Sequence, residues 1–260
     1  MTTVFLGGGR ITSALLAGLR LARYRNPIVV YDRHPEKLAE LRRRYRVRIE
    51  SDLARAVSSA DLLIIAVRPA SVRDLLEEIG TVKRPLATLS LAAGIPLMKL
   101  KGGGRVQWAR AMPSPVCRIG HGLTALTFSR GFRTSARREV RKLFSQVGTV
   151  VEIPERQFDI FTVTFSSSHG YHALATLSAA AEAIGLDRKT ARLAAAHALA
   201  DGVLAWRGSK LRIKELVREA ATPGGTAAAV MEKMNRSGYR RIVEQGLRAG
   251  IKRAQKNARL

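Results

Sequence analysis

The stretch TVFLGGGRITSALLAGL, residues 3–19, decides the fold. A short β-prone segment leads into a cluster of glycines, and an alanine- and leucine-rich helical segment follows directly. In such a strand–turn–helix, Gly7 permits the tight turn and Gly9 lets the backbone approach a pyrophosphate, while the helix start offers free N–H groups. Thr12 occupies the third position of this fingerprint, where glycine is usual. The stretch predicts a dinucleotide-binding turn, with a purely structural turn as the alternative.

Apolar segments alternate with amphipathic ones through the first half of the chain. We expect strands at 3–6, 28–31, 47–49, 62–66, 86–91 and 106–109, and helices at 11–24, 35–45, 52–59, 70–79 and 96–100. A strand at 123–128, a helix at 134–147 and a strand at 149–153 are expected to complete the sheet. This alternation predicts a doubly wound, mostly parallel sheet with right-handed crossovers.

After Pro154 the sequence has the pattern of helices almost throughout. We expect them at about 157–184, 188–206, 211–221, 225–235 and 238–257, separated by the breaks IGLDR, WRGS, TPGG and NRSG. The predicted fold is an α/β Rossmann domain over residues 1–154, followed by an all-α domain over residues 155–260.

Composition limits the class of protein. Hydrophobic residues make up 46% of the 260 residues, enough for a sizeable core, and no apolar run approaches the length of a membrane span. The opening MTTVFLGGG lacks the basic region of a signal peptide, and the single Cys117 cannot form an internal disulfide. We therefore expect a globular cytoplasmic protein without a membrane partner.

The net charge of +25 would suit a nucleic-acid-binding protein. The basic residues are spread over nearly every predicted helix, however, and the aromatic residues, 5% of the chain, form no stacking pattern. We favour an arginine-rich solvated surface that helps to attract anionic ligands, and we keep nucleic-acid binding as the weaker alternative.

The end of the second predicted strand, VVYDRHPEKL, should contact the ribose of a bound dinucleotide. Asp32 can accept hydrogen bonds from both ribose hydroxyls, which favours NAD, whereas Arg33 can pair with a 2′-phosphate, which favours NADP. The two cues conflict. We prefer NADP and leave NAD open.

Six segments along nearly the whole chain fall into one pattern. They are FLGGGRITSALLAGL, ADLLIIAVRP, LSLAAGIP, RAMPSPVCRIGHGLTAL, FDIFTVTFSSSHGYHAL and ATPGGTAAAVMEKMNRSGYRRIVEQGLRAGIKRA. In order and spacing they resemble the pyrroline-5-carboxylate reductase family. The resemblance implies a Rossmann domain followed by a helical dimerisation domain, and so a homodimer or larger homo-oligomer. It also implies an NAD(P)H-dependent oxidoreductase acting on C=N, which reduces pyrroline-5-carboxylate to proline. A related imine acid or oxo acid stays open as the substrate.

By the same resemblance, two later strand ends join the glycine turn around the cofactor. AVRP (66–69) follows the fourth predicted strand and AAG (92–94) follows the fifth, and ligands of open α/β sheets bind outside such carboxyl ends. The expected cofactor-binding residues are Gly7, Gly9, Arg10, Ile11, Asp32, Arg33, Ala66, Val67, Arg68, Pro69, Ala93 and Gly94.

The motif TPGGT (222–226) is expected to hold the carboxylate of the substrate. Thr222 can cap the helix that follows, and the glycines leave N–H groups bare at the positive helix end. A plain helix cap is the alternative. The expected substrate-binding residues are Ser114, Thr222, Gly224 and Gly225.

The chain departs from the family's pattern where the substrate should lie. The family's M-P-N-T-P is MPSPV here, with Ser114 at the asparagine, and the second threonine of P-G-G-T-T, a proposed proton donor, is Ala227. Alanine cannot donate a proton, and the side chain of the adjacent Thr226 is rotated by about 100° around the helix. A non-catalytic NAD(P)-binding sensor or scaffold therefore stays an alternative to an enzyme.

Where the family has G-S-G-P-A-Y, residues 166–171 of this chain read SSSHGY. A serine hydrolase would need a base oriented by a carboxylate and a nucleophile elbow after a strand, so we interpret the serines as a helix cap and anion-facing hydroxyls. His169 replaces the family's proline, and histidine is the residue type that most often transfers protons in catalysis. A partly exposed, non-catalytic histidine is the alternative. The candidate catalytic residues are His169, Ser167 and Thr226, and no ligand spacing suggests a metal site.

Overall fold

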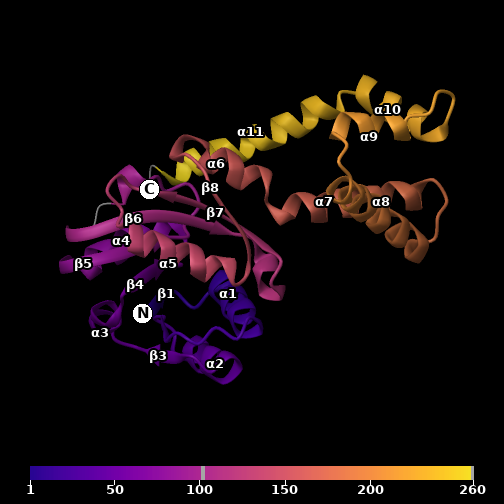
Figure 1. Cartoon of the computed structure of the whole chain (residues 1–260). Helices are drawn as coiled ribbons and strands as arrows, with labels where there is room; N and C mark the ends of the chain where they lie inside the picture. The colour runs from indigo at the N-terminus through magenta and orange to yellow at the C-terminus, as the bar shows by residue number, and fades with distance from the viewer. Residues whose placement is uncertain (101–102, 259–260) are drawn as a thin grey trace. The chain divides into compact units, whose positions relative to one another are not determined.

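A single sheet forms the centre of the N-terminal half. The computed structural model describes residues 1–100 and 103–258, and Figure 1 shows the arrangement of the elements. Within these residues the sheet has the order β3-β2-β1-β4-β5-β6-β7-β8. The strands are β1 (Thr3–Leu6), β2 (Ile28–Tyr31), β3 (Arg48–Glu50), β4 (Leu62–Ile65), β5 (Thr81–Ser90), β6 (Gly103–Pro113), β7 (Gly122–Phe128) and β8 (Gly148–Glu152).

Strands β1 to β6 all run in the same direction, because every neighbouring pair among them is parallel. β7 is antiparallel to β6, and β8 is parallel to β7. The predicted doubly wound, mostly parallel sheet is therefore confirmed. The order of the strands reverses between β1 and β4, which makes the carboxyl ends of these two strands the point where ligands of such sheets bind.

Two hydrophobic clusters cover the two faces of the sheet. Side chains alternate along each strand, so Phe5 of β1 belongs to one cluster while its neighbours Val4 and Leu6 belong to the other. Helices α1 (Arg10–Leu21), α2 (Pro35–Tyr45) and α5 (Thr134–Ser145) contribute to the first cluster, and α3 (Leu53–Ser59) and α4 (Val72–Ile79) to the second. This burial of apolar side chains is the main force that holds the layers together.

Several predicted boundaries were wrong. β5 starts at Thr81 rather than 86, and the helix predicted at 96–100 is only the short 3₁₀ turn Leu97–Lys99. The single helix predicted over 157–184 is two helices, α6 (Glu155–Thr164) and α7 (Ser167–Ala183), which are separated by Phe165 and Ser166. Periodicity alone did not detect this break, because the apolar pattern continues through it.

The chain forms two compact units, which are described here one at a time. The first holds residues Met1–Phe165 together with the end of α11 from Gly250, and the second holds Ser166–Ala249. α6 belongs to the first unit because it packs on β7. The division into compact units thus falls at Phe165, after the boundary at residue 154 that the change of sequence character indicates.

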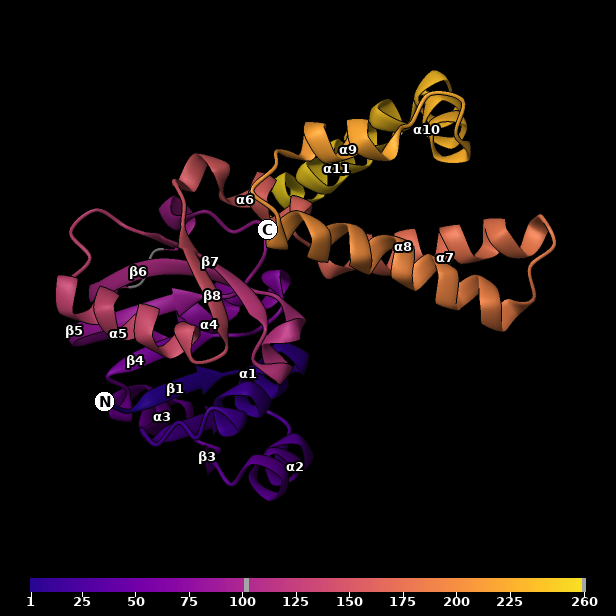
Figure 2. The same cartoon turned by 45° about the vertical axis from the view of Figure 1, so that its right-hand side comes forward.

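Every regular element that the structure describes in the second unit is a helix. They are α7, α8 (Arg188–Gly208), α9 (Ile213–Ala220), α10 (Thr226–Arg236) and the first part of α11 (Tyr239–Asn257). α7 and α8 lie side by side and pack on each other (Figure 2). Their contact buries small residues such as Ala191 and Ala195, while large side chains including Ile184 and Leu204 stay 87% and 65% exposed. Within the described residues, no helix is apolar enough over a sufficient length to cross a lipid bilayer.

A substitution of Gly18 in α1 can test how tightly the first unit is packed. A Cβ at this position would lie 2.0 Å from the carbonyl oxygen of Cys117 and 2.9 Å from Cγ1 of Val147. We expect Gly18→Ala to cost about 1–3 kcal/mol through overpacking and to lower Tm by roughly 2–12 °C, measured by circular dichroism. Gly246→Ala in α11 is the matched control, since a Cβ there meets nothing within 4 Å. Equal melting of the two variants would contradict this account of the packing.

Candidate functional site

Gly7 is the pivot of the turn after β1. It adopts φ +111°, in the region that favours glycine, and its amide donates to the carbonyl of Tyr31 over 2.8 Å. A Cβ on Gly7 would lie 2.7 Å from the carbonyl oxygen of Ala66, so only glycine fits between the ends of β2 and β4. The turn therefore sits at the carboxyl edge of the sheet, where the strand order reverses.

Thr12 locks this turn from inside. Its buried hydroxyl donates to the carbonyl of Gly7 over 2.6 Å. The sequence comparison with a glycine fingerprint predicted only a larger side chain at this position. The hydroxyl supplies a hydrogen bond that glycine cannot make, so Thr12 is a residue of the site that the sequence analysis missed. The sequence did carry a signal for this role, because threonine has a hydroxyl that can form a hydrogen bond.

The start of α1 offers backbone N–H groups to a ligand. Its N-cap is Gly9, without a side-chain cap, and its first turn, which begins with Arg10 and Ile11, contains no acidic residue. A Cβ on Gly9 would meet nothing within 4 Å, so space is open beside it. Unsatisfied N–H groups at a positive helix end are the donor set that a pyrophosphate requires, and this turn fits a dinucleotide.

Asp32 faces the glycine turn from the end of β2. Its Oδ2 accepts from the amide of Gly8 over 2.7 Å, and its Oδ1 accepts from the amide of His34 over 3.0 Å. The imidazole Nδ1 of His34 lies 2.7 Å from the same Oδ1. Burial raises the pKa of the Asp32 carboxyl, but the hydrogen bonds from Gly8 and His34, with the charge of Lys37, outweigh burial and hold the pKa below its ordinary value. Asp32 is therefore ionised at neutral pH and ready to accept further hydrogen bonds.

Arg33 follows Asp32 and pairs with Glu78 of α4. Its side chain is 60% exposed, so the pair is held weakly and the guanidinium can exchange partners. This geometry places Arg33 beside the position where an adenosine ribose would lie against Asp32. A 2′-phosphate would have to compete with the carboxylate of Glu78 for the guanidinium.

The ends of β4 and β5 lie along the same edge. The amide of Ala66 donates to the carbonyl of Leu6 over 2.8 Å, and the amide of Leu91 donates to the carbonyl of Ile65 over 2.9 Å. Val67, Arg68 and Pro69 follow directly after Ala66, and Ala93 and Gly94 follow after Leu91. The structure thus brings together all twelve predicted cofactor residues on one edge, contributed by four adjacent strands.

Ser114 follows β6, which is parallel to β5, so it lies at that edge too. Its side chain is mostly buried, at 8% exposed, and its Oγ accepts a hydrogen bond from the amide of Leu123 over 3.1 Å. The amide of Ser114 in turn donates to the carbonyl of Leu123. One acceptor site of the hydroxyl is therefore used in joining β6 to β7, and its hydrogen and second lone pair remain for a ligand.

The serine run forms the start of α7 in the second unit. Ser166 holds the N-cap position, as predicted, but its Oγ lies 2.7 Å from the Oγ of Ser168 and caps no backbone amide. The amide of His169 donates to the carbonyl of Ser166, so the histidine lies in the first turn of the helix with an exposed side chain. Ser167 is half-buried beside it.

The predicted role of Thr222 as a helix cap was wrong. The N-cap of α10 is Gly225, and the carbonyl of Thr222 instead accepts from the amide of Gly225 over 2.9 Å, which closes a turn. Gly224 adopts φ +78° in that turn. α10 starts at the exposed Thr226 with no side-chain cap and no acidic residue in its first turn, so its leading N–H groups are available to an anion.

Comparisons with known proteins agree with this arrangement. Residues 2–94 match the family described as NADP oxidoreductase, coenzyme F420-dependent, and residues 155–257 match pyrroline-5-carboxylate reductase dimerisation. The pyrroline-5-carboxylate reductase of Mycobacterium tuberculosis is 30% identical over 96% of this chain and 94% of its own length. That of Corynebacterium melassecola is 32% identical over 92% of this chain and 93% of its own length.

The chain belongs to the pyrroline-5-carboxylate reductase family. Among solved structures, the pyrroline carboxylate reductase of Plasmodium falciparum, crystallised with NADP bound, is similar to it with a TM-score of 0.88. That match covers 99% of this chain and 98% of the other at 19% identity, and so it shows a shared fold. The departures at Ser114, His169 and Ala227 are thus variations within this reductase family.

The ionised Asp32 predicts a pH dependence of stability. Because its folded-state pKa lies below the ordinary value of 3.8, the carboxylate stabilises the fold above that value, and this contribution is lost as the pH falls through the folded-state pKa. We expect Asp32→Asn to lower the free energy of unfolding at pH 6 and to differ less from the wild type near pH 3, measured by urea denaturation. A difference that is the same at both pH values would assign the effect to shape rather than charge.

Proposed function

We propose that this chain is an NAD(P)H-dependent reductase that converts pyrroline-5-carboxylate, or a closely related cyclic imine acid, to the corresponding amino acid. The observation that carries the proposal is the bare, glycine-lined start of α1 at the reversal point of the sheet. It belongs to a chain whose relatives named pyrroline-5-carboxylate reductase match it over nearly its full length.

The cofactor is proposed to be NADP, with NAD as the alternative, laid along the carboxyl edge of the sheet. The amides after Gly9 would hold the pyrophosphate, and Asp32 with Arg33 would contact the adenosine ribose. The strand-end residues 66–69 and 93–94 would border the nicotinamide half. When bound, the reduced cofactor supplies a hydride, and the residues of the chain contribute binding and orientation.

Reduction of the imine needs a hydride on carbon and a proton on nitrogen. We propose that the amides at the start of α10, with Thr222, Gly224 and Gly225, hold the carboxylate of the substrate. Since Ala227 has no proton to donate, His169 is the proposed donor to the nitrogen, with Ser167 and Thr226 as further candidates. An imidazolium that gives up its proton is regenerated from solvent, to which His169 is exposed.

A second copy of the chain is the proposed partner. The match to a dimerisation family covers residues 155–257, and the second unit leaves large apolar side chains uncovered, among them Ile184, Leu204 and Ile242. Exposed apolar surface of this extent favours burial against another chain. We therefore propose a homodimer or a larger homo-oligomer.

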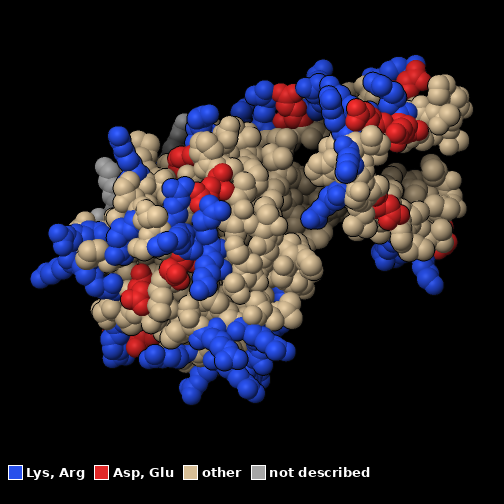
Figure 3. Space-filling view, viewed as in Figure 1, with Lys and Arg blue, Asp and Glu red and all other residues tan. Residues whose placement is uncertain are grey.

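The basic surface does not favour a nucleic-acid partner. On the face that Figure 3 shows, Lys and Arg lie over the sheet unit and the helices alike, with Asp and Glu between them. The basic cluster in the last turn of α2, Arg42 to Arg44, is one part of this distribution.

Cys117 is buried, which raises the pKa of its thiol to about 11, so it is an inert packing residue and suits the proposed cytoplasmic location.

A non-catalytic NAD(P)-binding protein is the second candidate. Two observations favour it: the hydroxyl oxygen of Ser114 already accepts a hydrogen bond from the amide of Leu123, and Ala227 lacks a hydroxyl. The two candidates share the cofactor site and differ only in turnover.

Turnover separates these candidates. We expect the purified chain to oxidise NADPH, followed at 340 nm, with pyrroline-5-carboxylate, and to be slower with a panel of other imine and keto acids. NADPH fluorescence measures cofactor binding in the same samples. Binding without turnover on any acid of the panel would favour the sensor, and absence of NADPH and NADH binding would contradict the proposed cofactor site.

The role of His169 is tested by substitution. We expect His169→Ala to lower kcat by about 10²-fold or more, because positioned proton donation contributes that much. His121→Ala is the control, since His121 is exposed and lies in the first unit. His34 is unsuitable as a control because its ring bonds to Asp32. If both variants keep kcat within twofold of the wild type, His169 is not the proton donor.

A further inference from the structure

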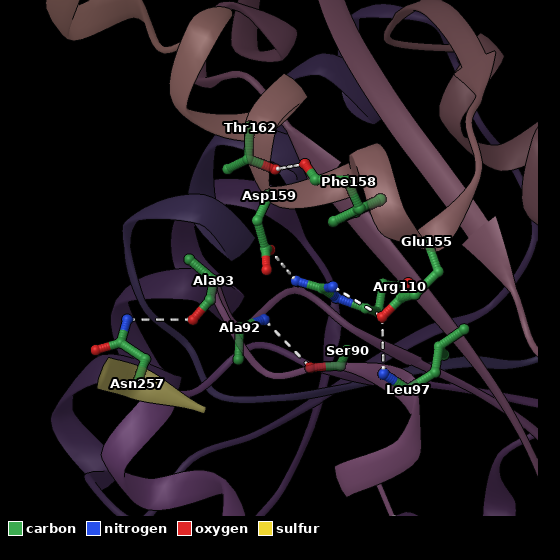
Figure 4. Close-up of polar contacts among 10 residues, drawn as sticks. All are labelled: Ser90, Ala92, Ala93, Leu97, Arg110, Glu155, Phe158, Asp159, Thr162 and Asn257. Carbon is green, nitrogen blue, oxygen red and sulfur yellow. Dashed lines mark hydrogen bonds and ion pairs between the residues drawn. The ribbon is translucent and has the colours of Figure 1, made fainter. Parts of the chain in front are cut away.

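The loop after β5, residues 91–97, lies at the edge proposed for the nicotinamide half of the cofactor; it is called the AAG loop below. At its start, the amide of Ala92 donates to the Oγ of Ser90 over 3.2 Å, within the same strand end. Figure 4 shows two polar contacts that reach the loop from segments distant in the sequence, one from α6 and one from the end of α11. Both segments belong to the first compact unit.

The end of α11 contacts the middle of the AAG loop. The side-chain amide of Asn257 donates from Nδ2 to the carbonyl oxygen of Ala93 over 3.3 Å. Gly94 adopts φ +78°, and a Cβ there would lie 2.4 Å from the carbonyl oxygen of Ala254. Glycine is thus required at 94 both by its conformation and by the close approach of the helix backbone.

α6 contacts the far end of the AAG loop. The amide of Leu97 donates to Oε1 of Glu155 over 2.9 Å, and the same oxygen accepts from Nη1 of Arg110 over 3.0 Å. Glu155 therefore links the loop to β6, the strand that carries Arg110.

Arg110 holds Glu155 in place. Its side chain is only 1% exposed, its Nη2 donates to Oδ1 of Asp159 over 2.5 Å, and its guanidinium lies 4.3 Å from the ring centre of Phe158. A buried cation with two carboxylate partners keeps this geometry, because moving either carboxylate would leave the charge without compensation. α6 is thereby fixed to the sheet next to the AAG loop (Figure 4).

The contact from Asn257 matters because of the part of the loop that it holds. Ala93 and Gly94 form a turn, and the hydrogen bond from Asn257 joins this turn to a segment distant in the sequence. Without the Asn257 amide, the peptide after Ala93 can rotate, and backbone groups that border a ligand would no longer be held in one orientation.

We propose that Asn257 and Glu155 are positioning residues of the cofactor site: they hold the AAG loop from outside, so that its backbone keeps the orientation that receives the nicotinamide half of the dinucleotide. The inference rests on the proposed function. It assigns to the last turn of the chain and to the first residue of α6 a part in binding the cofactor that neither the motifs nor the family resemblance assigned.

Asn257→Asp is the sharpest test, because aspartate has nearly the same shape and cannot donate to the carbonyl of Ala93. We expect the KM and the Kd for NADPH to rise about threefold to tenfold, as for a lost hydrogen bond. The KM for the imine acid should stay within twofold, and Tm should be unchanged. Lys256→Ala is the matched control, since Lys256 is exposed on the preceding position of the same helix.

A second pair of variants tests α6. Glu155→Ala removes the acceptor for the amide of Leu97 and should also raise the Kd for NADPH about threefold to tenfold. Glu155→Gln keeps an acceptor oxygen and should restore most of the affinity. Should Glu155→Ala prevent folding, the Asn257→Asp result decides the inference.

Each outcome bears on a different statement. A wild-type chain that binds neither NADPH nor NADH overturns the proposed function and this inference with it. A wild-type chain that binds NADPH, with Asn257→Asp and Lys256→Ala indistinguishable in Kd, overturns the inference alone. A rise in Kd that is matched by a lower Tm and a higher KM for the imine acid would assign Asn257 a structural role only, and would also overturn it.

Discussion

The site depends on the backbone contact between Gly7 and Ala66. At a separation where a Cβ would lie 2.7 Å from the carbonyl of Ala66, the turn after β1 can pass between β2 and β4 only with a hydrogen atom in place of a side chain. That passage leaves α1 starting at the carboxyl edge of the sheet with its N–H groups facing outward. Thr12 closes the turn by bonding to the carbonyl of Gly7, so the geometry is fixed before any ligand binds. An anion site built from backbone in this way needs no lysine or arginine of its own.

The sequence predicts the features that depend on the pattern of neighbouring residues. Alternating apolar segments indicated the sheet and its direction, and the glycine cluster located the edge that carries Asp32, Ala66 and Ala93. Contacts between distant segments were not predictable, because nothing near Gly94 in the sequence indicates that Ala254 will lie against it. Arg110 carried a partial signal: a charge between Ala109 and Ala111 must be paired if it is buried, but the sequence does not say that Glu155 and Asp159 are its partners. The missed helix break and the misassigned cap have local causes. The apolar pattern continues through Phe165 and Ser166, and the turn after Thr222 moves the N-cap to Gly225.

The departures from the family's pattern now have a physical setting. The hydroxyl of Ser114 accepts a hydrogen bond from Leu123, where β6 is joined to β7. Ala227 is the second residue of α10, a helix whose leading amides have no side-chain cap. The proposed binding of a carboxylate by backbone amides does not depend on those two side chains. What the two changes remove is side-chain hydrogen bonding and proton donation, which is the part of the chemistry that an imidazole at position 169 can supply. In the proposed function, carboxylate binding and proton donation therefore use different groups of the chain.

The hydrogen bond between Asn257 and Ala93 joins residues that are 164 positions apart in the sequence. A growing polypeptide emerges from its amino end, so the sheet and its glycine turn can assemble while the helical half is still being translated. The loop beyond β5 must wait for the final turn of α11 to leave the ribosome. The glycine turn can therefore form early in translation, whereas the contacts of the end of α11 with the loop form only after α11 has been translated.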